Sequence, residues 1–322
     1  MHAPSADQFS FQIERELSNN WALTVGWIAT KGTGLLDTLD GNPTIPGTKA
    51  AQRVNPNVGI VRERANAGSS IYHSLQTSVE KRLSRNFSMA AHYTWSMFID
   101  DASEVFNPSN TGEVAVAQDS FNRRLDRGRS TYDRPQRFAL NGVYEIPFLH
   151  EQKGFVGHVV GGWQLSGALT SQSGSPFSPL AGIDPGNVLT GIDGLVGSAV
   201  RPNILPGVSL AGVSINDIYR NGASKYFSEV TAANPIGNAG RNILRSTPLN
   251  NLDFAVNKIF RMPWEGHALS YRLELYNAFN HRNYGIPTAA IHSPAFANEG
   301  AAGGGTDNLL FRRIVMGLRY QF

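Results

Sequence analysis

The sequence predicts an all-β protein whose strands each have one apolar and one polar face. Two observations predict this class: apolar residues recur at every second position in about nine segments, and the connections between the segments alternate between short and long. The pattern is clearest in the last segment, where the alternating apolar residues are Ile314, Met316, Leu318, Tyr320 and Phe322. A period of two places these five side chains on one face of a strand.

The nine segments share this alternation and mark strands of about 9 to 13 residues, long enough to cross a tilted hydrocarbon layer. In chain order they are 9–14, 23–30, 74–84, 87–97, 137–146, 162–172, 251–257, 268–276 and 312–322. Their aromatic residues gather near the strand ends, and these are Phe87, Tyr93, Trp95, Tyr144, Trp163, Tyr320 and Phe322. Aromatic residues at strand ends are typical of the two interfaces of a membrane.

The connections indicate which medium surrounds the strands. The shorter ones are 16–21, 81–87, 148–161 and 260–267, and the long ones, rich in Gly, Pro and Asn, are 32–68, 100–135, 173–247 and 280–308. If the last strand ends on the periplasmic side, every short connection falls there and every long one outside. Compact soluble domains rarely contain several such loops, whereas outer-membrane barrels have short periplasmic turns and long outer loops. A single alternating strand would favour a soluble sandwich or propeller. Nine strands whose short connections all fall on one side and whose long connections all fall on the other favour a transmembrane barrel.

Composition excludes several classes of function. The 322 residues include no cysteine, which excludes a disulfide framework and a thiolate metal site. The net charge is only +3 and the basic residues are scattered, so no nucleic-acid partner is expected. The eight histidines are not clustered, so we expect no metal and no cofactor. The sequence contains no run of 18 apolar residues, so it does not predict a membrane-spanning helix. The first residues do not have the pattern of a signal peptide.

The polar faces supply the candidate site residues. We expect a water-filled lumen to be lined by Glu80, His92, Arg137, Glu145, Arg272, Glu274, Arg313 and Arg319. Their charges are mixed in sign, which indicates either ion pairs between neighbouring strands or a polar wall for hydrated solutes. The pattern does not define a selectivity.

Charged residues in the long connections are expected to have structural roles. Asp100 and Asp101 enter a long loop, so a solvated turn is favoured over a catalytic pair. The run 119–138 mixes three Asp with several Arg and is expected to pair internally and organise an outer loop, with binding of an anionic solute or a lipopolysaccharide phosphate as the alternative. The segment 237–242 is expected to re-enter the barrel. Since no catalytic arrangement is visible, the sequence does not predict an enzyme.

Several stretches resemble the C-terminal part of TonB-dependent outer-membrane receptors, specifically Oar-like barrels. The matching stretches are SIYHSLQTSVEKRLSRNFSMAAHYTWS, STYDRPQRFALNGVYEIPF, GGWQLSGALTSQSGSPFS, GNAGRNILRSTPLNNLDFAVNKIF, RLELYNAFNHRNYG and MGLRYQF. The resemblance implies an outer-membrane barrel of about 22 strands with a plug, energised by the TonB complex and importing large solutes such as glycans, peptides or metal chelates. The closing residues Leu318, Tyr320 and Phe322 resemble the signal read by the barrel-assembly machinery.

The chain also departs from this family pattern. It shows no plug domain, no segment that contacts TonB, no N-terminal domain and no signal peptide, and about nine strands are fewer than the family's barrel. With an odd strand number the first and last strands run the same way, and an open edge in lipid would leave unpaired amides. We therefore expect residues 1–322 to be the C-terminal part of a longer receptor that does not transport alone. The expected partners are outer-membrane lipid, the barrel-assembly machinery, the TonB complex through the missing plug, and an unidentified solute. The alternative is a soluble β-sandwich module that binds carbohydrate with its long loops.

Overall fold

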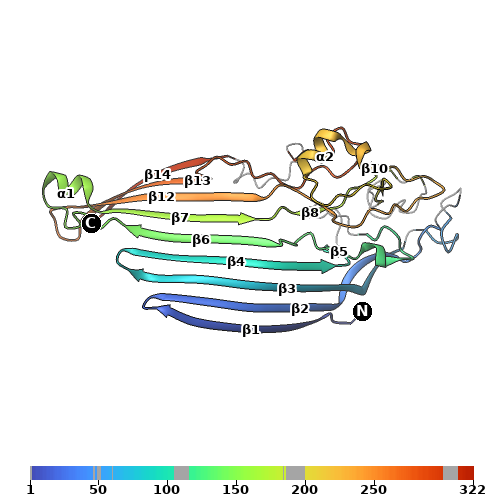
Figure 1. Cartoon of the computed structure of the whole chain (residues 1–322), viewed down its shortest axis with the longest axis horizontal. Helices are drawn as coiled ribbons and strands as arrows, with labels where there is room; N and C mark the ends of the chain where they lie inside the picture. The colour runs from blue at the N-terminus through green and yellow to red at the C-terminus, as the bar shows by residue number, and fades with distance from the viewer. Residues whose placement is uncertain are drawn as a thin grey trace.

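The protein forms one long antiparallel sheet with a body of packed loops at one end (Figure 1). The computed structural model describes residues 2–45, 48, 52–59, 61–104, 116–183, 185, 200–299 and 311–322. The long strands of the sheet are β1 (Ser5–Ser18), β2 (Trp21–Asp40), β3 (Arg62–Ser84), β4 (Phe87–Asp100), β6 (Gln136–Glu145), β7 (Trp163–Gln172), β12 (Leu249–Arg261), β13 (Ala268–Tyr276) and β14 (Arg313–Gln321). They follow one another in this order, and each pairs antiparallel with the next. The predicted all-β fold of about nine antiparallel strands is confirmed.

The sheet is open. Figure 1 shows β1 and β14 at its two edges, and within the described residues neither edge strand pairs with the other. Every residue of both edge strands is exposed, in contrast to the half-buried residues of the strands between them.

β2 and β3 extend further than the alternation predicts. They continue as a pair through much of the expected loop 32–68, with Leu36 opposite Asn66 and Asp40 opposite Arg62. Two register shifts near Leu35 interrupt the ladder, and Gly34 has a φ of 63°. A bulge of this kind breaks the period-two pattern without ending the pairing, which is why the sequence pattern predicted a loop there.

The short connections lie at the opposite end from the loop body. The β3–β4 turn has Arg85 and Asn86 at positive φ, as a tight hairpin requires, and the Lys81 ammonium donates to the Ser84 and Phe87 carbonyls at 2.9 and 2.7 Å. The β6–β7 connection contains a helix that the sequence pattern did not predict, α1 (Gly154–Val160). Figure 1 shows α1 and the C-terminus at this same end of the sheet.

The long connections pack together into a second structural unit, here called the loop body, formed by the described residues between β4 and β6, between β7 and β12, and between β13 and β14. It contains β5 (Gly128–Arg129), β8 (Pro176–Phe177), β9 (Asn203–Ile204), β10 (Phe227–Ser228), β11 (Leu244–Arg245), α2 (Ile215–Asn221) and the short 3-10 helices η1 (Arg123–Asp126) and η2 (Ala223–Lys225). Parts of the predicted loops, 105–115, 186–199 and 300–310, lie outside the described residues.

Among the described residues, both clusters of buried apolar side chains lie in the loop body. One buried cluster comprises Val116, Ala181, Val200 and Val230, and the other comprises Phe177, Ile215, Ile218, Tyr226, Phe227, Leu244, Phe296 and Ala297. The connections therefore have their own tertiary structure. In the described parts of the chain, no helix has both the length and the apolar character needed to cross a membrane.

Candidate functional site: the polar face of the sheet

The strand register produces one continuous apolar face. Residues that lie directly opposite each other in antiparallel strands point to the same side of the sheet. Leu75 lies between Trp27 and Trp95, and Leu169 lies between Leu140 and Leu252. The remaining strands continue this face in the same way, for example with Phe11 opposite Trp27 and Leu273 opposite Met316. Apolar side chains thus extend across the whole sheet.

The same register places all eight charged or ionisable candidates on the opposite face. They are Glu80 on β3, His92 on β4, Arg137 and Glu145 on β6, Arg272 and Glu274 on β13, and Arg313 and Arg319 on β14. Side-chain contacts bring together those near β13: Arg272 forms an ion pair with Glu274, and the Arg313 guanidinium lies 4.5 Å from the centroid of the Tyr276 ring. Glu145 accepts a long hydrogen bond of 3.4 Å from Gln164 on the adjacent strand.

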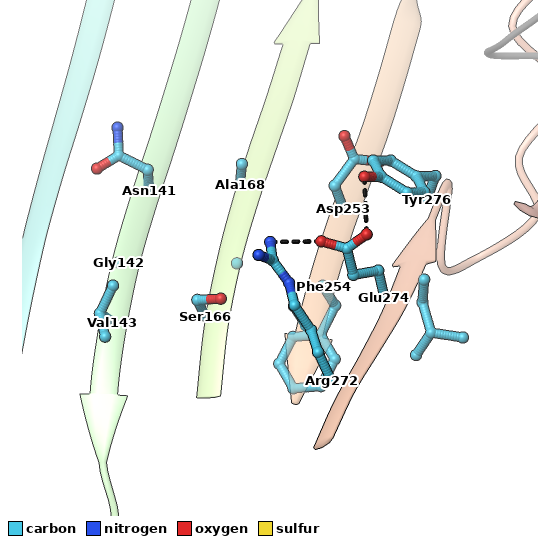
Figure 2. A pocket seen from close by; sticks show the side chains of 13 residues that line it. Asn141, Gly142, Val143, Ser166, Ala168, Asp253, Phe254, Arg272, Glu274 and Tyr276 are labelled. Carbon is cyan, nitrogen blue, oxygen red and sulfur yellow. Dashed lines mark hydrogen bonds and ion pairs between the residues drawn. The ribbon is translucent and has the colours of Figure 1, made fainter. Parts of the chain in front are cut away.

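A hollow of about 290 Å³ lies on this polar face between β6 and β13. Its floor consists of the small side chains of Ser166 and Ala168 on β7 and of Ala255 on β12, which leave space above the sheet. Figure 2 shows the Glu274 carboxylate between the Arg272 guanidinium and the Tyr276 hydroxyl. The Tyr276 hydroxyl donates to Glu274 at 3.0 Å.

Asp253 and Asn141 complete the walls of the hollow. Oδ1 of Asp253 accepts hydrogen bonds from the Asn251 side chain at 3.0 Å and from the backbone N–H of Asn277 at 2.9 Å. The hollow therefore combines guanidinium and amide donors with carboxylate and hydroxyl acceptors. Such a mixture can replace the water around a polar, uncharged group. In the part of the chain that the structure describes, no group of three or more His, Asp or Glu is placed to hold a metal ion.

The structure corrects the expectation for Asp100 and Asp101. Asp100 is only 3 % exposed, and its Oδ1 accepts from Nη1 of Arg241 at 2.6 Å. Asp101 accepts from both the backbone N–H and the hydroxyl of Ser69, at 2.9 and 2.6 Å. The predicted solvated turn is wrong because Arg241 of segment 237–242 approaches from a distant connection and covers Asp100.

The predicted internal pairing of the run 119–138 is only partly correct. Arg129 and Asp133 form the one internal pair seen among the described residues, at 3.6 Å. The other partners come from elsewhere in the chain. Asp126 pairs with Arg201 at 2.6 Å, Asp133 with Arg245, Arg123 with Asp37, and Arg127 with Asp101 at 3.2 Å. The run therefore joins β2, β4 and the β7–β12 connection to one another.

Burial alters the protonation equilibria in the loop body. Burial, reinforced by the Arg245 guanidinium, lowers the pKa of Arg134, and the Asp133 carboxylate opposes this shift. Burial raises the pKa of Glu299, although the hydrogen bonds of Thr247 oppose it. The backbone N–H of Thr247 donates to this carboxylate at 2.6 Å. The sequence placed Arg134 only in the mixed Asp and Arg run and did not identify Glu299, since burial inside a long connection leaves no local pattern.

Two of the three proposed assembly residues, Tyr320 and Phe322, lie beside the last short turn. Tyr320 and Phe322 stack with their ring centroids 6.2 Å apart, and the Tyr320 hydroxyl lies 2.6 Å from Nδ1 of His267. Trp264 packs on the same histidine, with centroids 6.0 Å apart. Leu318 lies opposite Tyr271 on the apolar face.

Comparison with known proteins identifies the family. Residues 1–314 match the family model described as the outer membrane beta barrel domain. The chain belongs to this outer-membrane barrel family. The expected location in the outer membrane is thereby confirmed, as is the resemblance to outer-membrane receptor barrels at the level of the family. The apolar face described above is the face that such a barrel presents to lipid.

Two solved structures are similar to this chain. The outer membrane transporter YddB from Escherichia coli is 12 % identical, with a TM-score of 0.45, over 99 % of this chain and 32 % of the transporter. P. aeruginosa FpvA, solved bound to a heterologous pyoverdine and iron, is 10 % identical, with a TM-score of 0.43, over 98 % of this chain and 27 % of FpvA. The chain thus spans about a third or less of these proteins. No curated protein matches the sequence.

Proposed function

We propose that residues 1–322 are the C-terminal part of the barrel of a TonB-dependent outer-membrane transporter, which imports a large solute such as a glycan, a peptide or a metal chelate. The observation that supports this proposal is the two-faced sheet. One face is apolar across all nine long strands and suits lipid, while the other bears the eight charged or ionisable candidates and a polar hollow. A lumen lined in this way passes hydrated solutes.

Closure of the barrel requires strands beyond this sheet. β1 and β14 both run from the loop-body end to the short-turn end, so pairing them directly would be parallel. An odd number of further strands restores antiparallel closure and pairs the edge amides, which lipid cannot satisfy. We propose that a longer receptor provides these strands together with the plug that contacts the TonB complex, and that this chain does not transport alone.

The polar hollow is the proposed contact point for solute within the lumen. Arg272, Glu274 and Asp253 offer donors and acceptors within one small region, which suits hydroxyl-rich or amide-rich solutes. We propose binding and passage there, with no catalysis. The barrel-assembly machinery is the proposed reader of Leu318, Tyr320 and Phe322.

The soluble alternative is less well supported. A carbohydrate-binding sandwich would cover the apolar face with a second sheet. In the described residues the other two sheets have two strands each, and both belong to the loop body. The apolar residues of the main sheet that are exposed include Trp27, Leu75 and Trp95.

Uptake by the full-length receptor tests the proposal. Cells that produce the receptor should accumulate labelled oligosaccharides, peptides or iron chelates in a TonB-dependent manner, and Arg272→Ala should lower uptake of the accepted class several-fold without lowering the amount of receptor in the outer membrane. Arg85→Ala, in the β3–β4 turn, is the matched control. A chain that is monomeric in plain buffer and melts at a higher temperature with sugar would instead support the soluble module.

A further inference from the structure

The helix α1 exposes an apolar surface at the short-turn end of the barrel. Phe155 is 84 % exposed and Val156 62 %. We call the exposed residues of this region the α1 patch; they are Phe148, Leu149, Phe155, Val156, Val159 and Val160. A periplasmic turn surrounded by water would not favour so many exposed apolar side chains in one short segment.

The contacts of α1 place its C-terminal end on the lipid side of the sheet. Lys258 lies opposite Trp163 and Tyr271 in the ladder, and therefore on the apolar face. The Lys258 ammonium donates to the Val159 carbonyl at 3.3 Å and also to the Gly161 carbonyl. Trp163 Nε1 donates to the same Val159 carbonyl at 2.9 Å. These carbonyls end the helix, where a cation is favourable, so α1 is fixed above the apolar face.

Gln152 holds the start of this segment against the end of β12. Its Nε2 donates to the Ile259 carbonyl at 2.7 Å, and its Oε1 accepts from the Arg261 N–H at 3.0 Å. The side chain thereby supplies the pairing that β7 no longer provides beyond Trp163. Gln152 is buried, and Gly157 packs against it so closely that a Cβ at Gly157 would lie 2.8 Å from the Gln152 carbonyl carbon. The α1 patch is thus presented by a well-anchored segment.

We infer that α1 lies in the membrane interface at the short-turn end and that phospholipid covers the α1 patch. Two features favour lipid over another occupant. The patch is continuous with the apolar face through Trp163 and Lys258, and that face is the lipid-facing surface of an outer-membrane barrel. Lys153, which pairs with Glu151, precedes the first residue of α1, and a cationic side chain beside apolar ones suits the boundary between phosphate headgroups and acyl chains. The inference depends on the membrane location of the barrel and not on its transport activity.

Site-specific fluorescence tests the inference. Because these 322 residues contain no cysteine, Val156→Cys gives a single site in this chain for an environment-sensitive fluorophore, and Glu151→Cys, on the exposed approach to the helix, is the matched control. The label is placed in the proposed full-length receptor, with any cysteine outside these residues replaced by serine, and the receptor is reconstituted in vesicles of phosphatidylethanolamine and phosphatidylglycerol. The label at 156 should emit at shorter wavelength, and lipids with nitroxide groups on their acyl chains should quench it several-fold more strongly than the label at 151. Iodide, which stays in the water, should quench the label at 151 more strongly than the label at 156.

Two outcomes would overturn the inference. If iodide quenches both labels equally in the vesicles, the α1 patch faces water. If the label at 156 is open to iodide in vesicles but shielded in native outer membranes, a protein partner covers the patch in place of lipid. A second readout does not depend on the label and uses a background in which the other four tryptophans of the chain are replaced by phenylalanine, so that Trp163 alone emits. Val156→Leu should leave this emission unchanged, while Val156→Glu should shift it towards that in water without loss of β-sheet circular dichroism. Unchanged Trp163 emission in the Glu variant would also contradict lipid contact.

Discussion

Arg241 forms a buried ion pair with Asp100 across 141 positions of sequence, with 2.6 Å between Nη1 and Oδ1. Nη2 of the same arginine donates to the Ser103 hydroxyl at 2.7 Å. Asp100 ends β4, while Arg241 belongs to the connection between β7 and β12. This contact therefore fixes a long outer connection onto the end of a membrane-crossing strand.

Removing one partner of this pair should loosen the loop body. Arg241→Met leaves the Asp100 carboxylate buried without its cation, a change that typically costs about 3–5 kcal/mol. Hydrogen exchange in segment 200–247 should accelerate, while exchange in β13 should stay the same. Arg127→Ala breaks the more exposed pair with Asp101 and should cost about 0–1 kcal/mol. If both variants exchange alike, the buried pair does not fasten the loops.

The stability of the loop body should depend on the protonation of Glu299. Because burial raises the pKa of this carboxyl in the folded protein above its usual 4.5, the folded state holds the proton more tightly than the unfolded state does. The contribution is full below the unfolded pKa and declines as the pH rises through the raised pKa. Protection of the Thr247 amide, corrected for intrinsic exchange, should therefore decrease from pH 4.5 upward.

A neutral variant isolates this effect. Glu299→Gln keeps an oxygen that accepts from Thr247 but cannot ionise, so its protection should change less with pH than that of the wild type. Glu265→Gln, exposed in the β12–β13 turn, should behave as the wild type. Equal pH dependence in all three proteins would remove Glu299 as the cause.

The two faces of β13 predict opposite responses to neighbouring substitutions. Leu273 lies opposite Val256 and Met316 on the apolar face, whereas Glu274 lies opposite Ala255 and Val315 on the polar one. Leu273→Arg should destabilise the membrane-inserted barrel by about 2–4 kcal/mol near the midplane, and Glu274→Gln should have little effect. Unfolding by urea in lipid vesicles measures both. Similar losses for the two variants would contradict the assignment of faces.

The sequence predicted the sheet well because the two faces differ at every step along each strand. That signal is local, so nine strands and the common face of residues such as His92 and Arg272 could be found without neighbours in space. The extension of β2 was missed because the bulge at Gly34 interrupts the period of two. The partners of Asp100 and Asp126 were missed because Arg241 and Arg201 belong to another connection, and nothing in the local pattern links them.

The same limit applies to α1 and to the hollow. The segment 148–161 was expected to be a turn, because a seven-residue helix is too short to show a clear helical period. The hollow depends on three small residues of β7 and β12 that become neighbours only through the register. Arg272 and Glu274 were identified individually, but their ion pair and the contact with Tyr276 required the structure.

The cluster around the last strand predicts a separable role for its final aromatic rings. Deleting Phe322 removes one ring of the stacked pair with Tyr320. It should slow assembly of the proposed full-length receptor into the outer membrane, measured as the fraction that becomes heat-modifiable with time. Tyr320→Phe keeps the ring but removes the hydroxyl that contacts His267; it should assemble nearly as the wild type and lower stability by about 1 kcal/mol, the usual contribution of one hydrogen bond. Gln321→Ala is the control: it changes a side chain at the C-terminus on the other face of the strand and removes no aromatic ring. If the Phe322 deletion assembles at the rate of the Gln321 variant, the terminal ring is not part of the assembly signal; if Tyr320→Phe fails to assemble, the turn contact and not the ring itself carries that signal.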